Sequence, residues 1–395
     1  MDHFYKLLQE IRMTSSRREF LRSLGIGAAA GAAAPWSLGE IPAAQVSEPA
    51  PAGQSDRITI LDSNENAYGP SPKVADAIRS ALGTVNRYPF RKYDEVTEQI
   101  ARFHHVKPDQ VLFACGSTEI LRVAADAFPG DGRQLIQAWP TFEAIQDYAK
   151  AVGSAVVSVP LSDNFAHDLN GMLARLGPST GLVYICNPNN PTATLTPRKD
   201  LEDFIGQLPA TTQVLIDEAY HQYAGQSEVY ASFIDHPLDD ERVIVTRTFS
   251  KVYGLAGLRL GYAVASPKVI EKMRALLTQD SLNAIVAEVV GVALDDSDGV
   301  KRAVQRNRDD RQEFRNSAML RMMMPIDSHA NFMMMDTQHR AEDVIQHFRK
   351  HNVLIGRHFP PMDTYIRVSL GTPAQMQAFW QAWDLLPWAK KIMHH

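Results

Sequence analysis

Short apolar runs alternate with longer segments of helical periodicity through the middle of the chain. The runs are rich in β-branched residues and predict strands, whereas the segments between them repeat apolar positions at helical spacing. Strands that alternate with helices favour a mostly parallel sheet covered on both faces. The predicted strands are Gln110–Ala114, Gln134–Gln137, Ala155–Val159, Leu182–Cys186, Val214–Ile216 and Val243–Thr246. The predicted helices between them are Glu119–Ala127, Phe142–Val152 and Pro197–Leu208.

The C-terminal part of the chain carries a different pattern, in which a long charged helix precedes shorter elements. The predicted order is a helix at Gly299–Met319, a strand at Asn331–Met335, a helix at Ala341–His351, a strand pair at Val353–Ile355 and Tyr365–Ser369, and a helix from Pro373. We therefore expect a large domain over residues 90–294. Residues 53–89 and 295–395 are expected to form a small α+β domain.

Residues 1–52 are predicted to be an export signal and linker. Arg17 and Arg18 precede Phe20-Leu21 and the Ala/Gly-rich run Leu24–Ala34, a pattern that resembles the twin-arginine signal of bacteria. The run is too short and too rich in small residues for a stable membrane span. We expect the twin-arginine translocase to carry the folded protein to the periplasm, with cleavage near Pro42–Ala44 or Ala50–Ala52; the alternative is a simple basic patch.

Composition narrows the classes of function. Hydrophobic residues make up 45% of the 395-residue chain and charged residues 22%, as in soluble globular enzymes. The net charge of −5 gives no electrostatic case for a nucleic-acid partner. The 2 cysteines and 13 histidines show no metal-ligand spacing, so no metal site is expected. The methionine runs Met322–Met324 and Met333–Met335 are interpreted as core filler.

The densest chemistry lies around Lys251, which is followed eight residues later by Arg259. A lysine that loses its proton near neutral pH can form a Schiff base with an aldehyde. An arginine can bind a phosphate group through two parallel hydrogen bonds. Thr248 and Ser250 place hydroxyl donors beside the same group. This segment predicts an aldehyde ligand that also carries a phosphate.

A carboxylate and a tyrosine upstream complete the predicted binding site. Asp217 follows an apolar run, which puts it at the carboxyl end of a predicted strand, where ligands sit in open α/β sheets. It could pair with a protonated pyridine nitrogen, while Tyr220 and Asn190 hydrogen-bond the ring oxygen. Phe142 could stack on the ring or serve as a core aromatic. Together with Lys251, these residues predict pyridoxal 5'-phosphate as the cofactor.

The phosphate site is expected to include the turn Gly116-Ser117-Thr118. This turn follows a predicted strand and opens a helix, so its backbone amides and the helix N-terminus could face an anion. The alternative for Ser117 is ordinary helix capping.

These motifs carry a family resemblance that covers the chain from about Ile60 to its end. The chain resembles the fold-type I pyridoxal-phosphate-dependent aminotransferases of class I and II, in their histidinol-phosphate aminotransferase branch. The matching segments are Asp62–Pro70, Asn86–Pro89, Pro140–Phe142, Asn187–Thr192, Asp217–Tyr220, Thr248–Lys251, Leu255–Arg259, Ala330–Phe332 and Ile366–Thr372. The resemblance implies a mostly parallel seven-stranded sheet flanked by helices, with a small α+β domain.

The resemblance also assigns substrate residues. Arg367 matches the arginine that binds the α-carboxylate, and Arg357 matches one associated with the substrate's phosphate. Tyr68 and Asn331 match positions in the substrate pocket. Tyr88 matches a tyrosine that reaches the cofactor phosphate of the neighbouring subunit, which implies a homodimer with shared active sites.

The expected reaction moves an amino group from an amino acid, or a histidinol-phosphate-like amine, to a 2-oxo acid. Lys251 would act as the general base, with Asp217 and Tyr220 as the other catalytic residues. The alternative is a pyridoxal-phosphate-dependent lyase, decarboxylase, oxidase or cyclase, because one fold and one cofactor serve all these reactions. A non-enzymatic binding protein would tolerate loss of Lys251, Asp217 or Arg259, and all three are present. The family's usual glycine after Asn-Pro-Thr is Ala193 here, so this loop is expected to be less free to adopt positive φ, with catalysis retained.

Overall fold

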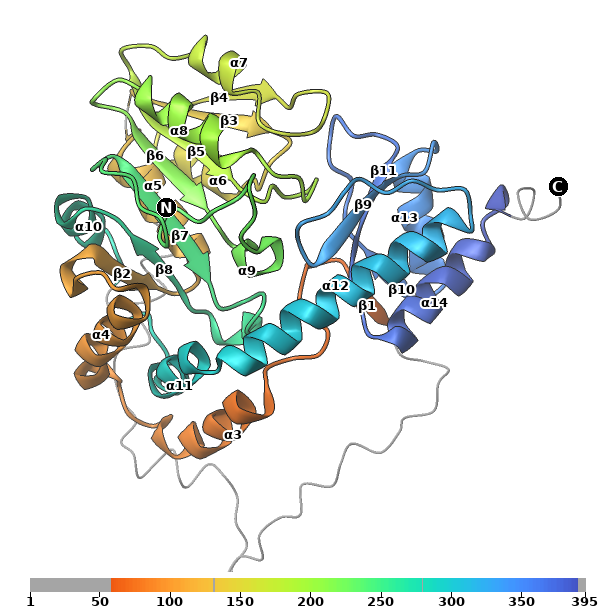
Figure 1. The fold of residues 1–395 in the computed structure, drawn as a ribbon, viewed down its shortest axis with the longest axis horizontal. Helices are drawn as coiled ribbons and strands as arrows, with labels where there is room; N and C mark the ends of the chain where they lie inside the picture. Colours follow the sequence, from red (N-terminus) through yellow and green to blue (C-terminus); the bar gives the residue numbers. More distant parts are fainter. Residues whose placement is uncertain (1–57, 131, 279, 390–395) are drawn as a thin grey trace, which may run out of the picture. The chain divides into compact units, whose positions relative to one another are not determined.

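The computed structural model describes residues 58–389, except 131 and 279 (Figure 1). The predicted twin-arginine signal and both candidate cleavage sites lie outside the described residues. Among the described residues, no helix is both long enough and apolar enough to cross a membrane. In the same range, no three metal-ligating side chains come together in a group that could hold a metal ion.

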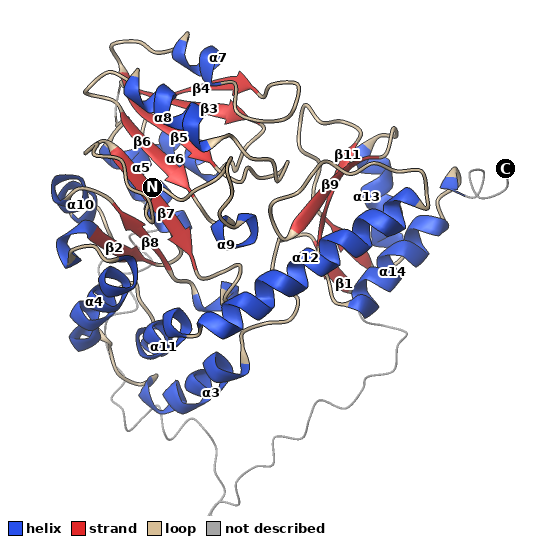
Figure 2. Cartoon of the chain, in the orientation of Figure 1, coloured by secondary structure: helices blue, strands red, loops and turns tan. Residues whose placement is uncertain are grey.

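A mixed sheet of seven strands runs in the order β2-β8-β7-β6-β5-β3-β4 (Figure 2). The strands are β2 (Val111–Ala114), β3 (Gln134–Trp139), β4 (Ala155–Pro160), β5 (Thr180–Cys186), β6 (Gln213–Asp217), β7 (Val243–Thr248) and β8 (Gly261–Val264). Only β8 is antiparallel to its neighbours, β2 and β7. The predicted mostly parallel seven-stranded sheet is therefore confirmed, although β8 was missing from the predicted strands.

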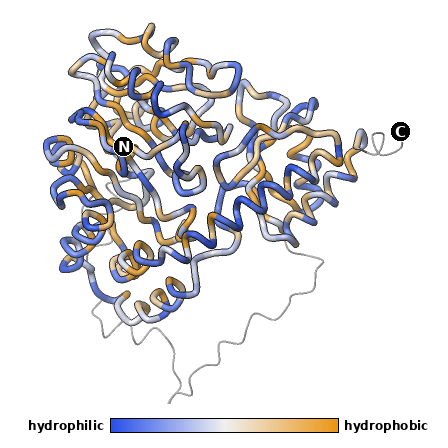
Figure 3. The backbone as a smooth tube through the Cα atoms, in the orientation of Figure 1, coloured by the Kyte–Doolittle hydropathy of each residue, from blue (hydrophilic) through white to orange (hydrophobic). Residues whose placement is uncertain are grey.

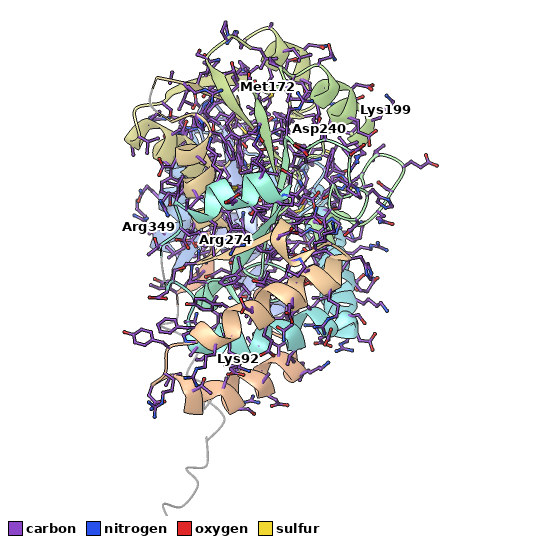
Figure 4. The ribbon with its side chains drawn as sticks, turned by 90° about the vertical axis from the view of Figure 1, so that its left-hand side faces the viewer. Lys92, Met172, Lys199, Asp240, Arg274 and Arg349 are labelled. Atoms are coloured by element: carbon purple, nitrogen blue, oxygen red, sulfur yellow. The ribbon has the colours of Figure 1, made fainter. Side chains whose placement is uncertain are left out.

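The sheet is covered by helices on both faces, and its strands alternate between two apolar clusters. In β5, Val183 and Ile185 face one cluster, whereas Leu182 and Tyr184 face the other. This double burial explains why the strand runs are continuously apolar instead of alternating with polar residues. The first face packs against α4 (Tyr93–His104), α7 (Leu169–Leu173), α8 (Arg198–Gly206) and α11 (Ala284–Asp295). The second packs against α5 (Ser117–Ala127), α6 (Ala144–Ala151) and α10 (Pro267–Arg274). Met172 of α7, labelled in Figure 4, is fully buried on the first face.

Two short sheets lie in the part built from both ends of the described chain. Strand β1 (Thr59–Leu61) pairs in parallel with β10 (Val353–Ile355), and β9 (Phe332–Asp336) pairs antiparallel with β11 (Tyr365–Ser369). The predicted pairing of the last two strands with each other is wrong, because each of them pairs with a strand from earlier in the chain. Helices α13 (Ala341–Lys350) and α14 (Pro373–Asp384) contribute side chains to the same apolar cluster as these strands.

Helix α12 (Ser297–Met319) leads from α11 to this part, and much of it is hydrophilic in Figure 3. Met333, Met334 and Met335 in β9 are fully buried, as predicted. The core interpretation is wrong for Met322 and Met324, which are 68% and 79% exposed in the segment after α12.

The remaining helix, α3 (Pro72–Ala81), packs against α11. The residue limits of the two predicted domains stay a prediction.

Candidate active site

A cavity of about 990 Å³ opens where β5, β6 and β7 end. Polar side chains that follow these strands line it together with residues from β11 and from the loop after β10. The predicted residues that line this cavity are Ser117, Thr118, Phe142, Asn190, Asp217, Tyr220, Thr248, Ser250, Lys251, Arg259, Arg357 and Arg367. Residues far apart in the sequence therefore meet at the carboxyl edge of the sheet, where the parallel topology favours ligand binding.

Asp217 is the last residue of β6 and its side chain is almost fully buried. Burial raises the pKa of its carboxyl group to about 6. Hydrogen bonds from the Tyr184 hydroxyl (3.0 Å) and the Ala219 N–H (3.1 Å) to Asp217 oppose that rise. A buried carboxylate held by neutral donors is suited to a cationic partner, such as a protonated pyridine nitrogen.

Lys251 follows β7 and its amine reaches the opposite wall of the cavity. Its Nζ donates to the carbonyl oxygens of Asn64 at 2.9 Å and Ser63 at 3.3 Å. Burial, and then the positive charge of Arg367, lower the pKa of Lys251 to about 8. Attack on an aldehyde requires a neutral amine, and the lowered pKa gives Lys251 a larger neutral fraction near pH 7 than an ordinary lysine has.

Two parts of the predicted phosphate site, the turn at Gly116 and the side chain of Arg259, lie in close contact. Gly116 has φ +79°, and a Cβ added there would lie 2.9 Å from Cζ of Arg259. Arg259 Nη1 donates to Ser250 Oγ at 3.4 Å, and Thr248 Oγ1 donates to the same Ser250 oxygen at 3.0 Å. The guanidinium therefore lies directly against the strand-to-helix turn.

The N-terminus of α5 completes this phosphate site. Ser117 is the first residue of α5, and no side chain caps this helix, so the capping alternative for Ser117 is wrong. Free backbone amides beside an arginine form a site for a dianion. Phosphate, buried carboxylate and reactive lysine sites in one cavity together fit pyridoxal 5'-phosphate.

Tyr220 and Asn190 lie beside the carboxylate. The Tyr220 hydroxyl accepts a 3.1 Å hydrogen bond from Asn64 Nδ2, and burial raises its pKa, so it stays protonated and can donate. Asn190 Oδ1 accepts from Arg367 Nη1 at 2.7 Å, which turns its amide donors to other partners. Phe142 lines the cavity and also packs against the second apolar cluster, so its two interpretations are compatible.

The two substrate arginines lie in different environments. Arg367 is buried and donates to Asn190 and to the carbonyl of Asp62, but its Nε has no partner among the described residues. Burial lowers the pKa of Arg367 to about 10. Arg357 is half exposed and pairs with Glu143.

Tyr68 and Asn331 line a neighbouring cavity of about 310 Å³ rather than the larger one. The Tyr68 hydroxyl donates to Asp310 Oδ1 at 3.3 Å. Asn331 Nδ2 donates to the carbonyl oxygens of Asn64 and Glu65, both at 3.1 Å. Their substrate roles stay predictions. Tyr88 also lies away from this chain's larger cavity; it is 76% exposed and stacks on Phe90 with ring centroids 5.0 Å apart.

Asn64 is a site residue that the sequence reasoning missed. It has φ +53°, and its carbonyl, its side chain and its N–H contact Lys251, Tyr220 and Ser369 respectively. The available signal was its residue type, because asparagine tolerates the left-handed region better than most residues. Tyr184 was missed because it lies inside an apolar strand. Ala193 adopts φ +61° where the family has glycine, so this loop takes a positive φ without that glycine.

The chain is similar to known proteins over most of its length. Residues 56–382 match the family model for aminotransferases of class I and II. The histidinol-phosphate aminotransferase of Caldicellulosiruptor saccharolyticus is 34% identical over 330 residues, which span 83% of this chain and 91% of that protein. The aromatic amino acid aminotransferase of Rhodococcus jostii is also 34% identical, over 81% of this chain and 87% of that protein.

A solved structure shows the same fold with its cofactor. The histidinol-phosphate aminotransferase of Sinorhizobium meliloti, in complex with pyridoxal-5'-phosphate, superposes with a TM-score of 0.78 at 26% identity. The match covers 85% of this chain and 92% of that one. The chain therefore belongs to the class I and II aminotransferase family and is a pyridoxal-phosphate-dependent aminotransferase.

Proposed function

We propose that this aminotransferase uses a donor that carries an acidic group beside its amine, and that Arg367 holds that group. One observation carries the proposal: Arg367 is a buried guanidinium, and no carboxylate among the described residues pairs with it. A buried cation without an anion is costly unless a ligand supplies one. A carboxylate or a phosphate would match the planar fork of the guanidinium.

The other cavity residues receive matching roles. When bound, the cofactor supplies an aldehyde carbon and a ring that withdraws electrons. Asp217 would hold the ring nitrogen, Tyr220 and Asn190 the ring oxygen, and Phe142 one ring face. Lys251 would hold the cofactor and then carry a proton to and from the donor's reacting carbon. The residues assigned to the phosphate are Gly116, Ser117, Thr118, Thr248, Ser250 and Arg259.

A single-turnover experiment tests the reaction type and the role of Arg367. Loaded enzyme is mixed with donor alone, and the 2-oxo product is counted per active site. Amino transfer gives at most one equivalent until a 2-oxo acid is added. Continuous release of product, carbon dioxide or ammonia without acceptor would support a lyase, decarboxylase or oxidase instead. Arg367→Gln is expected to raise KM for the donor on the order of 100-fold, because a desolvated charge pair is lost.

We propose that the protein is a homodimer in which Tyr88 reaches the partner's cofactor phosphate. An exposed apolar run between α3 and α4 supports this: Leu82, Val85, Tyr88 and Phe90 are between 48% and 76% exposed. Such a patch on one chain favours burial against another. Light scattering should give twice the mass of one chain, and Tyr88→Phe should weaken cofactor binding while the dimer persists. A monomer that binds the cofactor fully would contradict the proposal.

We propose that the twin-arginine translocase exports the protein to the periplasm. The support is the residue pattern around Arg17 and Arg18 alone. Cell fractionation of the double Arg→Lys variant should show the protein retained in the cytoplasm. Equal periplasmic amounts of variant and wild type would refute the proposal.

A further inference from the structure

Two guanidinium groups meet at one aromatic ring in the outer part of the large cavity. Cζ of Arg357 lies 4.2 Å from the centroid of Phe359, and Cζ of Arg367 lies 4.7 Å from the same centroid. Both arginines line the cavity that contains Lys251. A donor whose amine reacts near Lys251 therefore meets both positive charges.

Among the described residues, Arg357 forms an ion pair and Arg367 does not. Glu143, just before α6, pairs with Arg357 across the cavity. The Arg357 side chain is 51% exposed and that of Glu143 is 27% exposed, so a ligand can reach both. Arg367 has only neutral acceptors, namely Asn190 Oδ1 and the carbonyl of Asp62. Of the two guanidinium groups, one is therefore paired with a carboxylate, whereas the other is held by neutral oxygens.

Among the described residues, no other carboxylate of the cavity wall forms an ion pair with either arginine, although the charge of Asp62 acts on Arg367 from nearby. Asp147 and Arg349 (labelled in Figure 4) line the same cavity with opposite charges. Glu342 contacts His358 Nδ1 at 2.7 Å, and Asp363 contacts its Nε2 at 2.8 Å. Glu143 is therefore the carboxylate that pairs with one of the two arginines.

We propose that Glu143 is a specificity-determining residue that makes this site prefer a monoanionic carboxylate to a dianionic phosphate monoester. The inference rests on the proposed role of Arg367 as the anion-holding residue. A carboxylate supplies one negative charge and matches the unpaired guanidinium. A phosphate monoester carries close to two negative charges near neutral pH. It must either displace Glu143 from Arg357 or lie close to a like charge, and both weaken its binding.

The proposed donor class is thus an α-amino acid with an uncharged side chain. Phe142, Ile345, Ile355 and Phe359 supply apolar surface in the same cavity, which suits an aromatic or aliphatic side chain.

Two non-reactive probes that share one aromatic group isolate the effect of charge. The dissociation constants of 3-phenylpropionate and 2-phenylethyl phosphate are measured on loaded wild-type enzyme by calorimetry. The wild type should bind the carboxylate more tightly. Glu143→Gln should shift the ratio toward the phosphate on the order of fivefold or more, because Arg357 then becomes free for a second charge.

Matched variants separate pairing from a general field effect. Asp147→Asn removes a negative charge from the same cavity wall without touching Arg357, and it should leave the ratio near wild type. Combining Glu143→Gln with Arg357→Gln should abolish the shift. An unchanged ratio in Glu143→Gln, or an equal shift in Asp147→Asn, would overturn the inference. Failure of the proposed function is distinguishable, because Arg367→Gln would then weaken neither probe.

Discussion

The hydroxyl of Tyr184 donates a 3.0 Å hydrogen bond to Oδ2 of Asp217, and both side chains are buried on neighbouring strands. Tyr184 faces the second apolar cluster, so its ring is fixed by packing while its hydroxyl holds the carboxylate. The hydrogen bond favours the charged carboxylate, whereas burial opposes it. The balance between them decides whether Asp217 can serve as the anion beside the ring nitrogen.

Tyr184→Phe should therefore impair catalysis through the pKa of Asp217. Without the donor, that pKa rises above its present value of about 6, and more of the carboxyl is protonated at neutral pH. We expect kcat/KM at pH 7 to fall roughly tenfold, and its acidic limb to move to higher pH. Tyr262→Phe is the matched control. The buried Tyr262 hydroxyl forms a 2.7 Å hydrogen bond with His104, and neither residue lines the cavity. Identical pH profiles for wild type and Tyr184→Phe would contradict this account.

Gly116→Ala should weaken cofactor binding. The new methyl group would lie against the Arg259 guanidinium and push it from the turn. We expect the dissociation constant of pyridoxal phosphate, from spectrophotometric titration of unloaded enzyme, to rise about tenfold or more. Gly132→Ala is the control: Gly132 has a similar φ of +71°, but an added Cβ meets nothing within 4 Å. Backbone strain alone would make the two variants behave alike, which would refute the contact argument.

The strands and the chemical groups could largely be predicted because their signals are local. Buried parallel strands are continuous apolar runs, and Lys251, Asp217 and Arg259 have side chains whose chemistry is specific. Pairing is not local: β10 finds its partner in β1, almost the whole described chain earlier. Strand β8 is short and follows a glycine-containing loop, and only the 3-10 turn Ala256–Leu258 lies between it and β7, so the strand–helix alternation does not predict it.

The missed parts of the site depend on backbone position rather than residue type. Asn64 matters through a carbonyl that accepts from Lys251, and every residue has a carbonyl. The Glu143–Arg357 pair joins residues 214 apart in sequence, a contact that no spacing rule predicts. Met322 and Met324 were misassigned because residue type predicts burial only on average.

Glu218→Gln should destabilise the fold with little change in activity per folded molecule. Arg247 and Glu218 form a buried ion pair with a 3.0 Å separation, and Glu218 also accepts from Ser232 and the Phe233 N–H. Removing one charge leaves a buried guanidinium partly uncompensated, so the free energy of unfolding should fall by about 3 kcal/mol. Urea denaturation measures this change.

A surface pair provides the comparison for Glu218→Gln. Lys199, labelled in Figure 4, pairs with Asp203, and both side chains are more than half exposed. Asp203→Asn should therefore change stability by less than about 1 kcal/mol. Equal effects for the two variants would mean that the buried pair contributes no more than a surface pair.

Lys251 should titrate far below an ordinary lysine in enzyme without cofactor. Its folded pKa is about 8 against an ordinary 10.5, mainly through burial and then through Arg367. Between these values the unfolded chain binds more protons than the folded one. The stability that Lys251 contributes is therefore present above pH 10.5 and is lost as the pH falls through about 8.

Brief acetylation at a series of pH values, read by mass spectrometry, measures this pKa directly because only the neutral amine reacts. The labelling midpoint for Lys251 should lie near pH 8. Arg367→Gln removes a nearby positive charge that disfavours the ammonium, so it should move the midpoint to higher pH. Arg357→Gln removes the same charge from a residue that is half exposed and already paired with Glu143, and should leave the midpoint in place. A midpoint that stays near that of surface lysines in all three proteins would show that the cavity does not prepare this amine for the cofactor.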